Sequence, residues 1–328
     1  MKIAVVGCGA VGSFYGAKLC RDGHDVHFLL RSDYEAVRNK GVLIRSKQGE
    51  FTVRPKCAIV PEAIGPSDLV LVALKTTANA ELVRLLPPLT IKRTAVITLQ
   101  NGLGTEDQLG TVVAPEQVLG GLAFVCLNRV APGIIHHIDH GTVVLGEHAR
   151  EAYSRTREIA FIFNHARIKT EVTNDLARAR WEKLVWNIPF NGLGVASAAG
   201  FDATFVGRIE TEERQSCLTT DRLLADRGWT RLVRDLMAEI IAIARALGHR
   251  LEDSQADVNI ERTMTMGAYK PSTVIDFERG QPLELQGMFL EPLRVGREAG
   301  VWTPRLEALC AVLSKLDPRP SEPTSPAA

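Results

Sequence analysis

The hydrophobic positions in the first third of the chain form short apolar runs that alternate with segments of helical spacing. Short apolar runs bounded by turn residues are typical of buried strands, and apolar positions three to four residues apart are typical of helices. Because a strand, a helix and a second strand in succession favour parallel pairing, the pattern predicts an α/β domain. The predicted strands are Lys2–Val6, Asp25–Leu30, Leu69–Leu74 and Ala95–Leu99, and the predicted helices are Val11–Asp22 and Ala78–Leu86.

The segment Gly133–Glu147 continues the sheet in a different form. It carries β-branched residues on both sides of His140 and Gly141, a pair that resembles the turn of a hairpin. We therefore expect a hairpin that turns at His140-Gly141, with an antiparallel pair that closes the edge of the sheet.

The pattern changes after about residue 170, where strand-like runs give way to helical spacing. This change predicts two domains: an N-terminal Rossmann domain over residues 1–172 and an all-α domain over residues 173–316. A proline-rich end, residues 317–328, is expected to be a disordered tail. The charged stretch 207–229 is unassigned, and a lid, an oligomer contact and a simple loop stay open for it. The predicted helices are Asp175–Leu193, Leu232–Leu247, Leu283–Ala299 and Arg305–Leu316.

Composition and charge narrow the class of partner. The 328 residues include 39 Lys and Arg against 38 Asp and Glu, a formal charge of +1 that argues against a nucleic-acid partner and favours a small molecule. The longest apolar run, Leu69–Leu74, is far shorter than the about 20 residues that span a bilayer, so no membrane partner is expected. The six cysteines are scattered without a C-x-x-C pair, and no signal peptide is evident. We expect reduced thiols in a cytoplasmic protein and leave a homodimer open.

The sequence Gly7-Cys8-Gly9-Ala10-Val11-Gly12 is a G-x-G-x-x-G motif that directly follows a predicted strand and opens a helix. In that context the motif binds a dinucleotide. The first glycine permits the turn, the second lets the backbone approach a pyrophosphate, and the third lets helix and strand pack closely. The thiol of Cys8 has no evident partner base, so its small size is its expected contribution.

The end of the second predicted strand selects between the two nicotinamide dinucleotides. An NAD site usually carries Asp or Glu there for the ribose 2′-hydroxyl, but this chain has Leu30-Arg31-Ser32. A guanidinium pairs well with a 2′-phosphate, so Arg31 favours NADP. In the alternative, Arg31 is a solvated surface residue and Asp33 binds the ribose.

Lys183, Asn187 and Asn191 recur every four residues and therefore share one face of a predicted helix. One ammonium and two carboxamides suit a cleft that binds a polar substrate and donates a proton, but spacing alone equally fits a solvated helix face. Lys75 and Asn101 each follow a predicted strand, so we expect both in the crevice of the glycine loop.

The histidines His136, His137 and His140 are close in sequence without forming a convincing metal site. Neighbouring side chains of a strand point to opposite faces, and no cysteine or carboxylate set completes the group. We expect no metal.

Together these residues resemble the ketopantoate reductases (2-dehydropantoate 2-reductases) over nearly the whole chain. The resemblance implies reduction of 2-dehydropantoate to pantoate by NADP(H), a step toward coenzyme A, in a cleft between a Rossmann domain and a helical domain. The motifs that carry it are GCGAVG at Gly7–Gly12, ALKTTAN at Ala73–Asn79, LQNGLG at Leu99–Gly104, WEKLVWNIPFN at Trp181–Asn191, KPST from Lys270, and FERGQPLEL ending at Leu285.

The resemblance also assigns roles. Lys183 matches the catalytic lysine that protonates the substrate oxygen, and Glu284 matches the glutamate that accepts a hydrogen bond from the substrate hydroxyl. Ser272 matches the serine that holds the carboxylate. Of the remaining matched positions, Asn187 and Asn191 contact the substrate, Lys75 and Asn101 meet the cofactor and the edge of the substrate, and Arg31 reads the 2′-phosphate.

One position departs from the family. Some members carry a further asparagine where this chain has Phe201, ten residues after Asn191. Together with the long stretch 207–229, this departure leaves open a paralogue that reduces another branched or aromatic 2-oxo acid to a D-2-hydroxy acid. A non-catalytic NADP(H) sensor is a separate alternative from a different class of protein.

Overall fold

The computed structural model describes residues 1–211 and 213–318. Contacts within the chain divide it into two compact units, unit 1 up to Arg180 and unit 2 from Trp181. The division falls inside one helix, whereas the sequence placed the domain boundary at 172/173, which stays a prediction. Residues 319–328 of the predicted tail lie outside the described residues.

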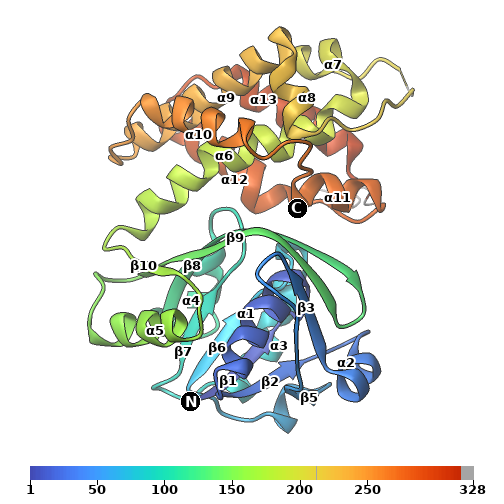
Figure 1. The fold of residues 1–328 in the computed structure, drawn as a ribbon. Helices are drawn as coiled ribbons and strands as arrows, with labels where there is room; N and C mark the ends of the chain where they lie inside the picture. Colours follow the sequence, from blue (N-terminus) through green and yellow to red (C-terminus); the bar gives the residue numbers. More distant parts are fainter. Residues whose placement is uncertain (212, 319–328) are drawn as a thin grey trace, which may run out of the picture. The chain divides into compact units, whose positions relative to one another are not determined.

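Unit 1 is built on one mixed sheet whose described strands run in the order β4-β3-β9-β8-β7-β6-β1-β2-β5, with β10 also paired to β9 (Figure 1). The pairs β7–β6, β6–β1 and β1–β2 are all parallel, as the sequence predicted. The strands are β1 Lys2–Val6, β2 Asp25–Leu29, β3 Val42–Ser46, β4 Phe51–Val53, β5 Lys56–Ala58, β6 Leu69–Val72, β7 Ala95–Thr98, β8 Val118–Ala131, β9 Ile134–Glu147 and β10 Thr170–Val172.

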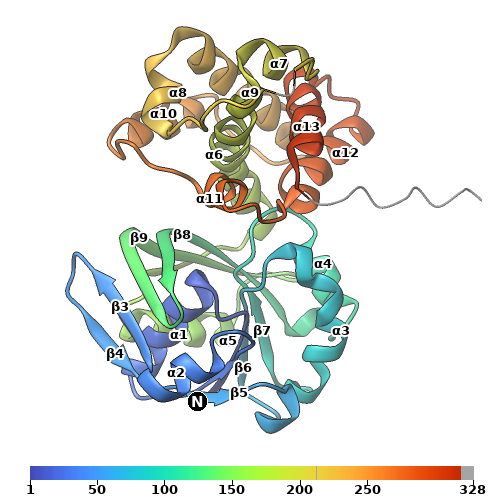
Figure 2. The same ribbon diagram turned by 90° about the vertical axis from the view of Figure 1, so that its right-hand side faces the viewer.

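Helices cover both faces of this sheet, because its central strands are apolar on both sides. In β1, Ile3 and Val5 pack with α1 and α5, whereas Ala4 and Val6 pack with α3 and α4 (Figure 2). The helices are α1 Ala10–Arg21, α2 Tyr34–Lys40, α3 Leu82–Leu85, α4 Thr105–Gly110 and α5 Ser154–His165, with short 3₁₀ turns at Pro61–Ala63, Thr76–Glu81, Pro87–Leu89 and Pro115–Gln117.

The predicted hairpin turn at His140-Gly141 is wrong. The chain turns at Pro132-Gly133, between the paired residues Ala131 and Ile134, and β9 continues unbroken past His140. His140 and Gly141 both have positive φ, 62° and 126°, and the register with β8 shifts between Phe124 and Val125 opposite them. The pair therefore forms a β-bulge, which bends a strand without reversing it. The β8–β9 pair also lies inside the sheet, since β3 and β4 extend the sheet beyond β9.

Unit 2 is helical and packs around α6, Leu176–Ala196, which enters it from unit 1. Residues on all sides of α6 are buried, including Val185, Ile188 and Val195, as expected of a helix inside a core. Figure 2 shows α8 and α10 on one side of α6 and α13 on the other. The other elements are α7 Phe201–Val206, α8 Thr220–Ala225, α9 Arg227–Ala246, α10 Ser254–Met264, α11 Ser272–Glu278, a π-helix Gln286–Leu290, α12 Glu291–Glu298 and α13 Pro304–Leu316, with a 3₁₀ turn at Ser197–Ala199.

The start of one helix and the start of the predicted tail differ from the sequence prediction. Helix α9 begins at Arg227 rather than Leu232, because the Asp226 side chain accepts hydrogen bonds from Gly228 N at 2.8 Å and Trp229 N at 3.0 Å. Asp317, the first residue of the predicted tail, accepts a hydrogen bond from Leu283 N at 3.1 Å. Helical structure thus takes up the end of the 207–229 stretch, and the ordered chain extends past 316.

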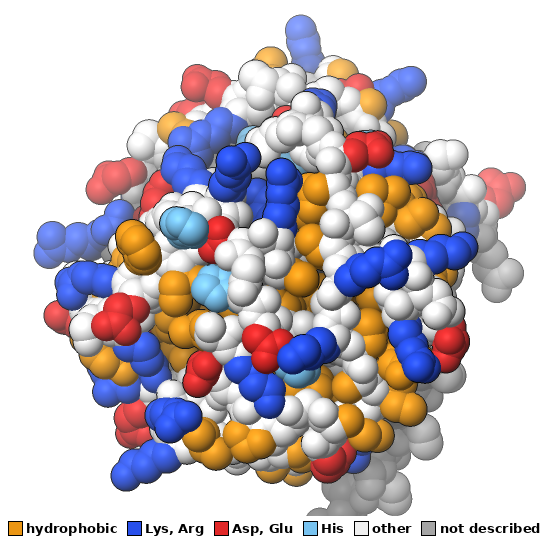
Figure 3. Space-filling model, turned by 60° about the horizontal axis from the view of Figure 1, so that its bottom comes forward, with side chains coloured by type: hydrophobic (Ala, Val, Ile, Leu, Met, Phe, Trp, Pro, Cys, Tyr) orange, Lys and Arg blue, Asp and Glu red, His pale blue; other side chains and the backbone are white. Residues whose placement is uncertain are grey.

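The described residues include no helix that is both long and apolar enough to cross a membrane. On the face that Figure 3 shows, Lys and Arg side chains are interspersed with Asp, Glu and hydrophobic side chains.

Candidate active site

The glycine loop has the geometry that a dinucleotide site needs. Gly7 has φ of 98°, and a Cβ there would lie 2.3 Å from Leu74 N, so only glycine fits. A Cβ on Gly12 would lie 2.2 Å from Gly7 O, whereas a Cβ on Gly9 would meet no atom within 4 Å. Gly9 is also the uncapped N-cap of α1. The first turn of α1 therefore presents free N–H groups and an open space to an anion, which fits a pyrophosphate.

Cys8 is partly buried inside this loop, where its thiol faces the carbonyls of Val5 and Leu29, at 3.5 Å each. Burial raises the pKa of this thiol well above its usual range, and the nearby Cys57 and Asp33 raise it further. Because the thiolate is the reactive form, these surroundings disfavour a reactive thiol, and the expected contribution of Cys8 through its small size stays a prediction.

The predicted cofactor residues of unit 1 follow the carboxyl ends of four adjacent parallel strands. Asn101 follows β7, Lys75 follows β6, the glycine loop follows β1 and Arg31 follows β2. Ligands of open α/β sheets bind at this edge, next to the point where the strand order reverses. The structure therefore brings all of these predicted residues of unit 1 to one side of the sheet.

Gln100 joins two of these loops and was missed by the sequence prediction. Its Nε2 donates to Leu74 O at 3.0 Å and to Asn79 Oδ1 at 2.6 Å, while its Oε1 accepts from Thr98 Oγ1 at 3.1 Å. The amide thus fixes the loop that carries Lys75 against the loop that carries Asn101. Its position inside the motif Leu99–Gly104 was the only sequence signal.

Arg180 also holds the loop that carries Asn101. Its side chain is 5% exposed, forms an ion pair with that of the buried Glu106, and donates to Gln100 O at 3.1 Å and Gly102 O at 3.4 Å. These carbonyls flank Asn101, so Arg180 orients the backbone around a predicted site residue. No sequence pattern pointed to this pair, because Glu106 and Arg180 are 74 residues apart.

Arg31 and Asp33, the two alternative ligands at the 2′ position of the ribose, differ in their surroundings. Arg31 is exposed and makes no hydrogen bond or ion pair with a described residue. Asp33 is 6% exposed and paired with Arg129, whose Nε lies 2.8 Å from its Oδ2. Burial raises the pKa of Asp33, but the hydrogen bond and charge of Arg129 outweigh it, so the pKa lies below its usual range. Asp33 is therefore an ionised carboxylate, and Arg129 is its counter-ion.

The polar row of α6 is buried in unit 2 rather than solvated. Asn187 is 6% exposed and Asn191 is 3% exposed, while Lys183 is partly buried. Asn191 accepts from Thr273 N at 3.3 Å and Thr273 Oγ1 at 2.9 Å, and donates to Asn187 O at 3.0 Å. It thus anchors the first turn of α11, next to Ser272. The predicted contact of Asn191 with a substrate stays a prediction.

Asn187 differs from Asn191 because its side-chain amide makes no hydrogen bond with a described residue. A buried carboxamide normally finds a partner, so this side chain is available to a polar ligand. Asn187 lies one helical turn from Lys183, the predicted proton donor.

Ser272 and Glu284 flank α11 and the π-helix of unit 2. Ser272 is exposed at the first position of α11, and Glu284 is 9% exposed, just before the π-helix. The π-helix packs on α6, since a Cβ on Gly192 would lie 2.9 Å from Phe289 Cε1. Both segments that carry these residues thus border α6.

The departure at Phe201 has a structural explanation within unit 2. Its ring lies 5.2 Å from that of Trp229, edge to face, and 5.9 Å from that of Phe205. Aromatic packing of this kind stabilises the contact between α7 and α9. The position therefore serves the core of unit 2.

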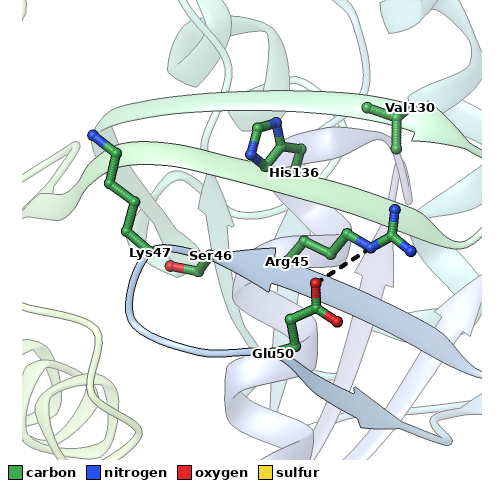
Figure 4. Close-up of a pocket in the computed structure, with 6 residues that line it drawn as sticks. All are labelled: Arg45, Ser46, Lys47, Glu50, Val130 and His136. Carbon is green, nitrogen blue, oxygen red and sulfur yellow. Dashed lines mark ion pairs between the residues drawn. The ribbon is translucent and has the colours of Figure 1, made fainter.

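The three histidines do not converge. His137 is buried, with Nδ1 at 2.9 Å from Ser46 Oγ and Nε2 at 2.9 Å from His140 O, and burial lowers its pKa. His136 instead lines a shallow surface pocket of about 470 Å³ with Arg45, Ser46, Lys47, Glu50 and Val130 (Figure 4). This pocket contains none of the predicted site residues. Among the described residues, no group of three or more His, Cys, Asp or Glu side chains fits a metal ion.

Comparisons with known proteins cover both units. The family model described as Ketopantoate reductase PanE/ApbA matches residues 3–150, and that described as Ketopantoate reductase PanE/ApbA C terminal matches residues 215–317. A 2-dehydropantoate 2-reductase of Nostoc sp. is 40% identical over 325 residues, covering 97% of this chain and 96% of the relative.

Solved structures extend the similarity to the fold. A 2-dehydropantoate 2-reductase from Geobacter metallireducens has a TM-score of 0.88 and 43% identity, covering 96% of this chain and 99% of the other. A D-mandelate dehydrogenase solved with NADH and anilino(oxo)acetate has a TM-score of 0.82 over 96% of this chain and 98% of its own. At 20% identity, this second likeness shows a shared fold alone.

Proposed function

The chain belongs to the ketopantoate reductase family, and from this premise we propose that it uses NADPH and that Lys183 is its proton donor. It reduces 2-dehydropantoate to pantoate, a step of pantothenate biosynthesis, with a nicotinamide dinucleotide as cofactor. The similarity to a 2-dehydropantoate 2-reductase over 97% of the chain carries this conclusion.

The choice of NADPH is supported by the end of β2. Arg31 is an exposed guanidinium without a described partner, and a guanidinium pairs with a phosphate through two parallel hydrogen bonds. Asp33, the competing ribose ligand, is engaged by Arg129. We assign Gly7–Gly12 and the N-terminus of α1 to the pyrophosphate, and Lys75 and Asn101 to the cofactor and the edge of the substrate.

The bound cofactor supplies a hydride to C2 of the substrate. Negative charge then develops on the ketone oxygen, and we assign the Lys183 ammonium to hydrogen-bond that oxygen, stabilise its charge and protonate it. Lysine carries this proton at neutral pH. Asn187 orients the substrate with its unused amide, Glu284 accepts a hydrogen bond from the substrate hydroxyl, and Ser272 donates to the carboxylate. Asn191 keeps Ser272 in place through α11 and is also assigned to the substrate.

The remaining assignments concern the compartment and the oligomeric state. The six cysteines are free thiols, which supports a reducing, cytoplasmic compartment. A homodimer stays a prediction.

The test is a steady-state comparison of NADPH oxidation with 2-dehydropantoate, 2-oxoisovalerate and phenylpyruvate, repeated with NADH. We expect the highest kcat/KM for 2-dehydropantoate with NADPH. A preference for an acid that lacks the hydroxyl would keep the reaction type and overturn the role of Glu284. Binding of NADPH without turnover on any 2-oxo acid would instead indicate a sensor.

The role of Lys183 needs its own variant. Lys183→Ala should lower kcat far more than it weakens NADPH binding, because the ammonium acts on charge that develops during the reaction. Lys315→Ala, on the exposed face of α13, is the control and should leave kcat unchanged. Unchanged turnover in Lys183→Ala would overturn the assignment.

A further inference from the structure

The carboxylate of Asp33 has no remaining capacity for a further hydrogen-bond donor. Its Oδ2 accepts from Arg129 Nε at 2.8 Å and from Gly133 N at 3.3 Å. Its Oδ1 accepts from a second guanidinium nitrogen of Arg129 and from Ser32 Oγ at 3.1 Å. An ionised carboxylate has about four acceptor positions, and these four donors fill them.

Three of the four donors to Asp33 come from a distant part of the chain. Arg129 lies near the end of β8, and Gly133 lies in the turn between β8 and β9, about 100 residues beyond Asp33. The Asp33 side chain is 8% exposed and that of Arg129 is 38% exposed, so the arginine covers the acid from the surface. The turn of the β8–β9 hairpin therefore closes over the start of α2.

An acid at this place has opposite effects on the two dinucleotides. A carboxylate with a vacant acceptor position binds the ribose 2′-hydroxyl of NAD, whereas its charge repels the 2′-phosphate of NADP. Asp33 is two residues from Arg31, so an unpaired Asp33 would also compete with a phosphate for that guanidinium. Pairing with Arg129 cancels both effects.

We propose that Arg129 is a positioning residue that sets the cofactor preference: by binding both oxygens of Asp33 it removes the ribose acceptor and leaves Arg31 to a 2′-phosphate. This inference rests on the proposed use of NADPH. On this proposal two arginines set the cofactor preference: Arg31 binds the 2′-phosphate, and Arg129 neutralises the competing carboxylate of Asp33.

The test measures Kd by isothermal titration calorimetry, and kcat/KM, for NADPH and NADH with the wild type and Arg129→Met. Methionine keeps the length of the side chain and removes the charge. Without Arg129, Asp33 regains a vacant acceptor position for the ribose 2′-hydroxyl of NADH. One such charge-assisted hydrogen bond should tighten NADH binding and lower the preference for NADPH over NADH about tenfold or more. Arg129→Met/Asp33→Asn should restore the preference to within about twofold, since the competing charge is gone.

Two further variants complete the design. Arg45→Met removes an arginine that pairs with Glu50 at 3.4 Å on the surface of the same unit, and it should leave the preference unchanged (Figure 4). Asp33→Asn alone should leave NADH affinity within about twofold of the wild type, because this acid is not available to the ribose. This second variant decides the question even where Arg129→Met does not fold.

The outcomes separate the inference from its premise. A wild type that prefers NADH would overturn the proposed cofactor. A wild type that prefers NADPH, together with an unchanged preference in Arg129→Met, would overturn only the role of Arg129. A large loss of NADH affinity in Asp33→Asn would also overturn it, because Asp33 would then bind the ribose.

Discussion

The buried ion pair between Arg180 and Glu106 allows a quantitative test of how the Asn101 loop is held. The Arg180 side chain is 5% exposed and that of Glu106 is 7% exposed, so neither charge is compensated by water. Glu106→Gln keeps the shape of the acid and removes its charge, which leaves a buried guanidinium without its counter-ion. Breaking a buried pair in this way costs about 3–5 kcal/mol of unfolding free energy.

The assay is urea denaturation followed by far-UV circular dichroism, with hydrogen exchange of peptides from residues 99–106 to locate the effect. Glu81→Gln is the matched control, because it breaks an exposed pair with Arg84 in the same unit, where the side chains are 56% and 66% exposed. An exposed pair contributes about 0–1 kcal/mol. A cost of Glu106→Gln no larger than that of Glu81→Gln would refute the reasoning.

A double variant separates stability from function. Glu106→Leu/Arg180→Met replaces the pair with apolar groups and should recover most of the unfolding free energy. It does not replace the hydrogen bonds from Arg180 to Gln100 O and Gly102 O, so kcat/KM for 2-dehydropantoate should stay low. Full activity in this variant would show that the loop does not depend on Arg180.

Three further predictions test other parts of the chain. Gly12→Ala should destabilise unit 1 by about 1–3 kcal/mol, because its Cβ would collide with a carbonyl, whereas Gly9→Ala should keep the stability and weaken NADPH binding, as calorimetry of both variants will show. The lowered pKa of Asp33 means that its stabilisation by Arg129 is present above about pH 4 and lost as the pH falls, so Asp33→Asn should flatten the acid side of the stability profile in urea titrations; an unchanged slope contradicts this. Glu284→Gln should lower kcat/KM for 2-dehydropantoate and spare 2-oxoisovalerate, and equal losses on both would argue against a contact with the substrate hydroxyl.

Features with a local cause could be predicted from the sequence. The motif Gly7–Gly12 lies between β1 and α1, where Gly7 and Gly12 have steric reasons that the spacing already implied and Gly9 leaves open space. The apolar runs predicted β1, β6 and β7, because a strand buried on both faces needs a nearly uninterrupted apolar stretch. Lys75 and Asn101 could be placed at one edge because they follow adjacent parallel strands.

Features that depend on contacts between residues far apart in the sequence could not be predicted. Arg129 meets Asp33 across 96 residues, and no spacing in the sequence indicates such a pair. The sequence favoured Arg31 as the ligand of a 2′-phosphate and kept Asp33 open as the alternative ribose ligand, without any sign that Asp33 is paired with Arg129. The burial of Asn187 and Asn191 had the same cause, since helices far along the chain cover that face of α6.

The error in the predicted position of the hairpin turn had a different cause. His140-Gly141 has the residue types of a tight turn, and both residues adopt positive φ, so the local conformation matches the expectation. The partner strand decides whether such a pair reverses the chain or is absorbed as one extra residue. Here β8 continues opposite β9, and the reversal falls at Pro132-Gly133 instead.

Helix α6 makes the two units inseparable as genetic modules. Separating the two units between Arg180 and Trp181 would cut a continuous helix and remove the i to i−4 hydrogen bonds that cross the cut. Chimaeras of two relatives keep all of α6 from one parent when their crossovers lie in loops outside Leu176–Ala196. The parent that supplies α6 must also supply a residue at position 180 that pairs with the acid at position 106. This single buried ion pair therefore limits which relatives can be recombined.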